Sequence, residues 1–357
     1  MRKFARTAWI VLIVFSVLLA ACGQNNKGTA SSGNSENNTG SSSNAQNAAA
    51  EQNAQNSQQQ PASDYPNRPI EVIVPFAPGG STDVIARILA ENVSKHLPNN
   101  QPVVVVNKPG GAATIGMAEL AAAKPDGYKL GVTSIDAISI QPHYGKVSYT
   151  PDSFEPIMQA AFVPLMLLVK KDSPWPDFES WLEYVKNNPN QFAYGSATGT
   201  GGVGHLAMEA LNLAAGIQTK HIPFEGRGPA VTALLGGHTQ GAIALLNPGE
   251  EDSMRALFNF AGHKSEAYQD IPLLKEKGFD VTGGVDTGIV APKGIPEDVL
   301  NILHEAFKKT IEDPAVAEQI KKLNVDVVYR GPEEFKQYIQ ENYDKNGKLI
   351  KEIGLAN

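Results

Sequence analysis

Apolar and polar positions follow two different periods along residues 65–357. Residues 70–74 form an apolar, β-branched run, which predicts a buried strand. Apolar residues then recur at helical spacing between positions 84 and 97, so a helix is expected there. Between the two lie the glycine-rich turn 78–80 and the polar residues 81–83, whose types favour helix caps. The pattern therefore predicts a strand, a glycine turn and a helix.

The same order of elements recurs along the chain. Strands alternating with helices predict an α/β protein whose sheets are mostly parallel and flanked by helices. In such sheets, ligands bind beyond the carboxyl ends of the strands, where these turns lie. The further units are strand 103–106 with turn 107–113 and helix 115–123, strand 129–133 running into residues 134–136, and strand 192–194 with turn 195–202 and helix 203–214.

The turn after the first strand has the properties of an anion site. Gly79 and Gly80 let the backbone approach a ligand closely. The start of the helix leaves several N–H groups without partners, and the positive end of the helix dipole favours a negative group. Such a cradle needs neither Arg nor Lys. By spacing alone, an ordinary strand–turn–helix connection is the alternative interpretation.

The N-terminal residues have the pattern of a secretory signal. Arg2, Lys3 and Arg6 precede the apolar run 8–18, which is short for a membrane span. The run leads into Leu-Ala-Ala-Cys, which resembles the bacterial lipobox, and there Cys22 would carry a diacylglyceryl group as the mature N-terminus. A signal peptide that merely contains a cysteine is the alternative. We expect a lipoprotein held on the outer face of the cell membrane.

Residues 1–21 are thus expected to be a signal peptide, and residues 22–64 a lipid-anchored linker. The linker is almost wholly Asn, Gln, Ser, Ala and Gly and lacks apolar periodicity, so it is expected to be disordered. The net charge is −7 and no basic stripe is present, which argues against a nucleic acid partner. Cys22 is the only cysteine, so neither an intrachain disulfide nor a cysteine-based zinc site is expected.

Catalytic interpretations find little support in the residues. Residues 195–199 read Gly-Ser-Ala-Thr-Gly, which is not the G-x-S-x-G pattern of hydrolases. His205 lies in the predicted helix and is expected to pack or to cap. His205 and Glu209 together supply only two of the ligands that a metal site needs. The glycine runs lack the Lys-Ser/Thr ending of phosphate loops. We therefore expect no enzyme, no cofactor and no metal site.

Several segments resemble one protein family. Residues 66–87, PNRPIEVIVPFAPGGSTDVIAR, resemble the opening of the substrate-binding proteins of tripartite tricarboxylate transporters, the Bug-type family. The resemblance continues through VVVVNKPGGAATIG, KPDGYKLGVTS, SFEPIMQ, FAYGSATGTGGVGHLAMEAL, HIPFEGRGPAVTALLGGHTQGAI and GIVAPKGIP to the closing EEFKQYIQENYDKNGKLIKEIGL. The departures are Ala112 and Ala113, where the family usually has glycines, and Gln240, where it usually has Asp.

The resemblance implies a periplasmic-binding-protein-like fold of two α/β lobes, each a mostly parallel sheet flanked by helices, with the ligand cleft between them. Lobe I is expected to contain residues 65–164 and 288–357, and lobe II residues 165–287. The segments 165–174 and 287–294 would cross between the lobes. In this family, amides of first-lobe loops take a carboxylate, often with bridging waters, and the second lobe closes over it.

The same resemblance implies the ligand-binding residues. Asp83 fits a helix cap or a loop brace better than a ligand contact, because its charge would repel an anion. Phe76 would either pack on the carbon skeleton of the ligand or simply form the wall of the cleft, and Ser134 is the weaker candidate for this pocket. The full set is Phe76, Gly79, Gly80, Ser81, Thr82, Asp83, Ser134, Ser196, Thr198, Gly199 and Thr200.

These expectations describe a non-enzymatic, extracytoplasmic receptor, expected to be a monomer, that captures a small organic carboxylate and delivers it to a two-component membrane permease. An extracytoplasmic sensor that presents its ligand to a signalling kinase is the alternative. A hydrolase would require turnover that Ser196→Ala removes. Lys108 and Arg227 are the only cationic candidates near the loops, which favours a mono- or dicarboxylate over a citrate-like trianion.

Overall fold

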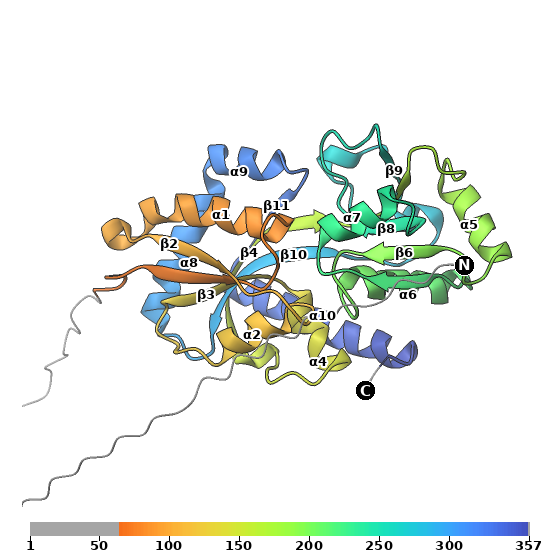
Figure 1. The fold of residues 1–357 in the computed structure, drawn as a ribbon. Coiled ribbons are helices and arrows are strands. Elements are labelled where there is room, and N and C mark those ends of the chain that lie inside the picture. Colours follow the sequence, from red (N-terminus) through yellow and green to blue (C-terminus); the bar gives the residue numbers. More distant parts are fainter. Residues whose placement is uncertain (1–63, 356–357) are drawn as a thin grey trace, which may run out of the picture. The chain divides into compact units, whose positions relative to one another are not determined.

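The computed structural model describes residues 64–355 (Figure 1). The expected signal peptide, Cys22 and all of the expected linker except Asp64 lie outside the described residues. The described residues belong to one unit of the chain and form two β-sheets. None of their helices is both long enough and apolar enough to cross a membrane.

The first sheet has six strands. They are β1 (Ile70–Val74), β2 (Val103–Asn107), β3 (Lys129–Ser134), β4 (Phe154–Pro164), β10 (Gly284–Pro292) and β11 (Asp326–Arg330). Their order across the sheet is β11-β4-β10-β3-β1-β2. β1 pairs in parallel with β2 and β3, whereas β10 is antiparallel to β3 and β4, and β11 is antiparallel to β4.

The second sheet has five strands. They are β5 (Met166–Lys170), β6 (Ala193–Ser196), β7 (Lys220–Pro223), β8 (Gly241–Ala244) and β9 (Met254–Asn259). Their order is β7-β6-β8-β5-β9. β6 pairs in parallel with β7 and β8, whereas β5 is antiparallel to β8 and β9.

Both sheets are therefore mixed rather than mostly parallel, which corrects the expectation drawn from the alternation of strands and helices. The path of the chain explains the difference. Helices connect β1, β2 and β3, so these strands run in the same direction. β4 carries the chain out of the first sheet and β10 carries it back, so the two run in opposite directions and pair along their lengths. The α/β class itself is confirmed.

The two connections between the sheets are tied together. Only Leu165 separates β4 from β5, and its carbonyl accepts a hydrogen bond from the Phe260 N–H over 2.9 Å. The chain returns at Gly283, whose N–H donates to the Phe260 carbonyl over 2.8 Å. β10 pairs with β4 from Gly284 onward, ahead of the lobe boundary predicted at Gly288. The lobe boundaries stay a prediction.

Helices flank both sheets (Figure 1). They are α1 (Ser81–Val93), α2 (Thr114–Ala121), α3 (Asp136–Ser139), α4 (Gln141–Tyr144), α5 (Phe178–Asn187), α6 (Val203–Ala215), α7 (Arg227–Leu235), α8 (Glu297–Glu312), α9 (Pro314–Lys321) and α10 (Pro332–Glu352). Short 3-10 turns occupy Ser94–His96, Pro98–Asn100, Pro151–Ser153, Glu266–Tyr268 and Leu274–Lys277. α1, α2, α8 and α10 pack against the first sheet, and α5, α6 and α7 against the second. α10 also contacts α3 and α4.

Two strands end later in the chain than the sequence predicts, and this changes the position of two candidate site residues. The strand predicted at residues 70–74 is β1, as expected. The strand predicted at 129–133 extends to Ser134, and the one predicted at 192–194 extends to Ser196. Both serines are therefore the last residues of strands rather than members of open turns, and both are buried.

The core around the second sheet is aromatic. Phe178 and Trp181 lie on the buried face of α5, and the carboxylate of Asp177 caps the start of this helix. The ring centroid of Trp181 lies 5.3 Å from that of Phe258 on β9 and 5.7 Å from that of Phe192. This cluster anchors α5 to the sheet that carries the β6–α6 loop.

Candidate functional site

The loop between β1 and α1 forms the first part of the candidate site. Gly79 has a φ of +85°, which residues with a side chain rarely adopt. α1 begins at Ser81, and its N-cap is Gly80 rather than one of the predicted residues 81–83, because Gly80 already has the extended backbone of a cap. No side chain among the described residues caps this end. The N–H groups of Ser81 and Thr82 have no acceptor within the helix, so they are available to an anion.

Asp83 braces this loop. Its carboxylate accepts hydrogen bonds from the Gly79 N–H (2.8 Å), Asn107 Nδ2 (2.8 Å) and Arg87 Nε (3.1 Å). Asn107 Nδ2 also donates to the Phe76 carbonyl over 3.0 Å, which ties the loop to the end of β2. Burial acts to raise the pKa of Asp83, but the hydrogen bonds it accepts, above all from Arg87, outweigh burial and lower the pKa. The structure therefore gives Asp83 the role of a charged brace.

The loop between β2 and α2 contacts the second sheet's loops. Ala112 and Ala113 have φ values of 51° and 77°, in the left-handed region that costs such residues about 1–2 kcal/mol each. The alanines thus hold a conformation that glycine adopts more easily. A methyl group on Gly199 would lie 3.8 Å from Ala112 Cβ, so this departure from glycine adds a side chain where the two loops meet.

The hydroxyl groups of the loop between β6 and α6 form hydrogen bonds that stabilise this loop. Ser196 is fully buried and donates to the Gly199 carbonyl over 3.1 Å. Thr198 Oγ1 accepts from the Gly204 N–H over 3.2 Å and so supports the start of α6. Thr200 is exposed. Among the described residues, the amides of Thr198, Gly199 and Thr200 have no backbone acceptor, so these amides, rather than the hydroxyls, are the candidate donors.

Two residues of α4, a helix on the side of the first sheet, contact the β6–α6 loop. Gln141 Nε2 donates to the Gly201 carbonyl over 2.9 Å. A methyl group on Gly201 would lie only 2.7 Å from Tyr144 Cδ1, so the ring packs closely on this glycine. The contacts that reach the β6–α6 loop from the side of the first sheet thus come from Ala112 and from α4. The hydrogen bonds of residues 76–83 stay, within the described part of the chain, on the side of the first sheet.

Two stacked histidines lie beneath the β6–α6 loop. The rings of His205 and His221 have centroids 3.9 Å apart and an interplanar angle of 15°. His205 Nδ1 accepts from the Gly201 N–H over 3.1 Å, which confirms the expectation that His205 packs or caps. His221 Nε2 lies 2.8 Å from Ser196 Oγ. Burial lowers the pKa of His205 to about 4, and burial followed by the charge of His205 lowers the pKa of His221 to about 3.

These pKa values predict that acid destabilises the protein. Below pH 6.5 the unfolded chain protonates both histidines, whereas the folded protein does so only near pH 4 and pH 3. The free energy of unfolding is therefore expected to fall as pH drops from about 6.5 toward about 4. Urea unfolding near pH 7 and near pH 5 measures the decline, and His221→Gln is expected to reduce it. The same substitution at the exposed His238 is the control, and an undiminished decline in His221→Gln contradicts the prediction.

The Ser196–His221 pair has the residue types of a serine hydrolase's nucleophile and base. A serine activated by histidine needs an accessible hydroxyl and a third group that orients the imidazole. Ser196 is 0% exposed, and its proton is donated to the Gly199 carbonyl. Among the residues that the structure describes, no carboxylate contacts His221. The pair therefore supports the loop rather than the chemistry of acyl transfer.

The remaining predicted residues lie in the wall of the site. Phe76 is half-buried and packs against the hydrophobic core, which fits the simpler interpretation of its role. Ser134 is buried and forms a hydrogen bond with the side chain of Asp136. Within residues 64–355, no group of three His, Cys, Asp or Glu residues is arranged to hold a metal ion.

Sequence reasoning missed the residues that support the loops: Asn107, Gln141, Tyr144 and His221. Each acts on a loop that is distant along the chain, so local spacing does not mark it. Asn107 is the exception in part, since a polar residue directly after the predicted strand 103–106 is a recognisable signal. The others become visible only when the chain is folded.

Lys108, Arg227 and Gln240, which the sequence analysis singled out, all form contacts within the protein. Lys108 Nζ lies 3.2 Å from the Glu119 carboxylate. Arg227 forms an ion pair with Glu250. Gln240 accepts from and donates to the backbone beside β6, so both ends of its amide are used. The candidate cradle therefore consists of backbone amides without an adjacent unpaired cation among these residues.

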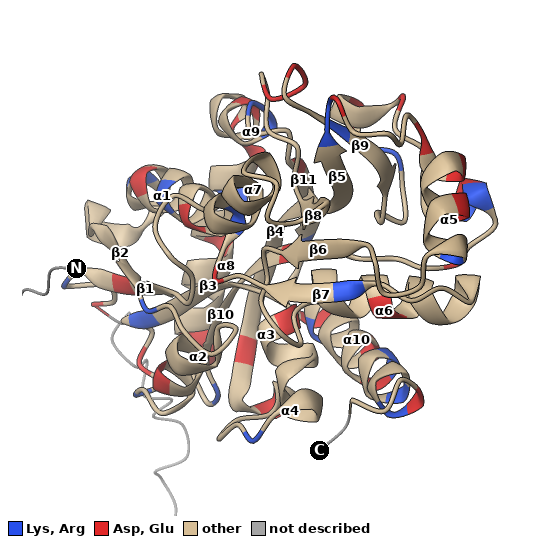
Figure 2. Cartoon of the chain, turned by 45° about the vertical axis from the view of Figure 1, so that its right-hand side comes forward, with Lys and Arg blue, Asp and Glu red and all other residues tan. Residues whose placement is uncertain are grey.

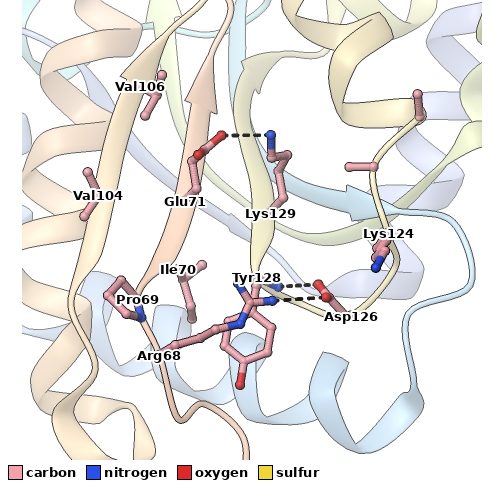
Figure 3. A pocket seen from close by; sticks show the side chains of 12 residues that line it. Arg68, Pro69, Ile70, Glu71, Val104, Val106, Lys124, Asp126, Tyr128 and Lys129 are labelled. Carbon is pink, nitrogen blue, oxygen red and sulfur yellow. Dashed lines mark hydrogen bonds and ion pairs between the residues drawn. The ribbon is translucent and has the colours of Figure 1, made fainter. Parts of the chain in front are cut away.

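A separate groove of about 600 Å³ lies at the other ends of the strands (Figure 3). Arg68 lies 3.7 Å from the ring centroid of Tyr128 and pairs with Asp126 over 3.2 Å. Glu71 pairs with Lys129 over 3.0 Å. These residues are at the amino ends of β1 and β3, away from the loops that follow the strands. The charges of Arg68, Asp126, Glu71 and Lys129 are already paired, and the loop amides that could bind an anion do not line this groove, so it is not the candidate site.

Two mixed β-sheets, flanked by helices and joined by β4 and β10, define a two-lobe solute-binding receptor of the periplasmic binding protein class. A family model identifies the receptor more closely. The model described as the tripartite tricarboxylate transporter family receptor matches residues 85–355. The chain belongs to this family, as its sequence predicted.

Similar proteins agree with this assignment. A protein of Cupriavidus necator described as "UPF0065 protein in gbd 5'region" is 33% identical over 302 residues, which cover 84% of this chain and 91% of the relative. The solved periplasmic binding protein BugD is 30% identical with a TM-score of 0.74, over 82% of this chain and 99% of that chain. MatC from Rhodopseudomonas palustris, solved with bound malate, is 27% identical with a TM-score of 0.72, over 80% of this chain and 100% of that chain.

Proposed function

We propose that this receptor binds a small organic carboxylate through the backbone amides of the β1–α1 and β6–α6 loops. The observation that carries the proposal is the uncapped start of α1. It follows two glycines, its first-turn N–H groups lack protein acceptors, and Asp83 fixes the loop without directing a free charge at it. Malate bound to the related MatC supports a carboxylate ligand.

The charge near the loops favours a ligand with few carboxylates. Lys108 and Arg227 are both paired with glutamates, so a citrate-like trianion would meet no unpaired partner in either of them. Backbone amides and a helix dipole offset one or two negative charges more readily than three. A mono- or dicarboxylate is therefore the proposed ligand class.

In this proposal, the protein acts on the outer side of the membrane as a monomer. Cys22 carries the lipid anchor, and the bound receptor closes because only the closed state allows both lobes to contact the ligand. The ligand then passes to a two-component membrane permease, without any catalytic step.

A sensor that presents the ligand to a signalling kinase would use the same binding chemistry. Permease genes beside the receptor gene favour transport, whereas a histidine kinase gene alone favours sensing.

A thermal-shift screen of the purified protein against mono-, di- and tricarboxylates tests the ligand class. A ligand that binds only the native state, at 100 times its Kd, stabilises it by about 2.7 kcal/mol. For a folded unit of this size, we expect the Tm to rise by roughly 4–5 °C. A dose-dependent rise with one class of mono- or dicarboxylate is the expected result. The proposal is wrong if every carboxylate leaves the Tm unchanged.

A further inference from the structure

A second cavity, of about 340 Å³, lies between α6 and α10. Figure 2 shows these helices together with α3, which supplies one wall through Asp136. Its volume is within the range of about 300–1,000 Å³ that small-molecule sites occupy. The amide donors of the proposed carboxylate site do not line it.

Asp136 is a buried polar residue of this cavity whose hydrogen bonds are incomplete. Its side chain lines the cavity although the residue is only 8% exposed. Within residues 64–355, its Oδ2 atom has no hydrogen-bond partner. Burial raises the pKa of Asp136 well above its ordinary range, the charge of Asp286 adds to this, and a hydrogen bond with Ser134 opposes it. A buried carboxyl oxygen without a partner is costly unless a ligand supplies one.

The other inner polar groups of the cavity are already paired. Asp286 accepts from Gln159 Nε2 over 2.7 Å and from the Tyr338 hydroxyl over 3.0 Å. The guanidinium of Arg330 stacks over the ring of Tyr338 at 4.0 Å and donates to Gln159. Arg330 therefore does not neutralise Asp136 by a direct contact. Burial raises the pKa of Asp286 as well, so without a cation in the cavity both inner carboxyl groups favour the neutral form. A cation beside Asp136 would stabilise its charged form and supply the partner that Oδ2 lacks.

The rest of the inner wall is apolar. α6 contributes Val203, Leu206 and Ala207, and Ile140 and Leu349 face the same cavity. Polar and charged residues at the exposed rim include Asp280, Lys345 and His263. The cavity thus combines one unpartnered carboxyl group with a hydrocarbon surface. This is a suitable environment for a cation that carries a compact apolar body.

We propose that this cavity binds a small organic cation, a primary amine with an apolar body, whose ammonium group donates a hydrogen bond to Asp136. The hydrocarbon part packs against α6, and the ammonium group supplies the partner that Oδ2 lacks. The amide donors of the carboxylate cradle do not line this cavity, so the receptor would bind two chemically different ligands at two places.

Isothermal titration of the purified protein with butylammonium tests the proposal, with butyrate, an anion, and butanol, a neutral molecule, as controls of similar size. Saturable binding of the amine alone is expected. Asp136→Asn, which keeps the size of the side chain, is expected to weaken it by about 10- to 100-fold, the loss of one charge-assisted hydrogen bond. Asp280→Asn, at the exposed rim, is the matched control and should retain the affinity.

A second variant separates loss of the site from loss of the fold. Ala210→Phe on α6 fills the cavity from its partly exposed side and should also remove amine binding, while circular dichroism shows a native melting curve. The proposal is overturned if the native protein does not bind butylammonium at millimolar concentration. It is also overturned if well-folded Asp136→Asn and Ala210→Phe bind the amine as tightly as the native protein. Because the carboxylate screen uses other ligands, its result does not decide this one.

Discussion

Gly80→Val is expected to abolish carboxylate binding while the protein stays folded. Gly80 has φ −75° and ψ 164°, an extended conformation open to any residue. A Cβ atom there would meet only the Ala77 carbonyl, at 3.7 Å, which is an ordinary contact. The branched side chain would, however, occupy the space in front of the first-turn amides of α1. Loss of about two hydrogen bonds to a charged ligand, each worth roughly 1.5–3 kcal/mol, corresponds to at least about 100-fold weaker binding.

Two comparisons make this prediction specific. Gly80→Ala adds only the Cβ atom and should weaken binding less. Gly228→Val places the same branched side chain in the first turn of α7, where a Cβ atom meets nothing within 4 Å, and should leave binding unchanged. Titration calorimetry with the ligand found in the screen measures all three affinities. Native affinity in a well-folded Gly80→Val protein would show that the cradle is not the binding site.

Trp181→Ala is expected to lower the free energy of unfolding by about 3–5 kcal/mol. Trp181 is 0% exposed and packs against Phe192 and Phe258, so its removal leaves a cavity between α5 and the second sheet. Such a loss is a large fraction of the stability of an ordinary protein. Urea unfolding followed by circular dichroism measures the change.

Trp181→Phe is the matched control for this prediction. Its ring keeps the aromatic packing, and Trp181 Nε1 has no hydrogen-bond partner among the described residues, so no hydrogen bond is lost. We expect less than half of the destabilisation caused by alanine. A cost below about 1 kcal/mol for Trp181→Ala would mean that the surrounding aromatic rings close the cavity, contrary to the dense packing of this core.

The local parts of the site were predictable because they depend on neighbouring residues. The apolar run of β1, the two glycines and the helical spacing of α1 all lie within one short segment. The charge of Asp83 argued against ligand contact, and its three hydrogen bonds agree with that argument. The resemblance along the chain predicted the family, which the family model confirms.

The roles of the serines were less predictable because strand ends depend on neighbouring strands. Ser196 pairs with Pro223 and Ile243 on the adjacent strands, which extends β6 and buries its hydroxyl. The partner of that hydroxyl, His221, lies 25 positions further along the chain. No local pattern links the two residues, so the ligand role expected for the Ser196 side chain stays a prediction that its hydrogen bonds do not favour.

The sequence by itself determined the order of strands, glycine turns and helices, the two glycines that precede α1 and the family. These follow from short-range periodicity, backbone preferences and matching segments. Only the tertiary structure decided the mixed pairing of the sheets, the contact of Ala112 with the β6–α6 loop and the burial of Asp136 without a partner. These features depend on the direction in which β4 and β10 run and on which distant side chains meet, because pairing and burial are settled by the whole fold rather than by neighbours in the chain.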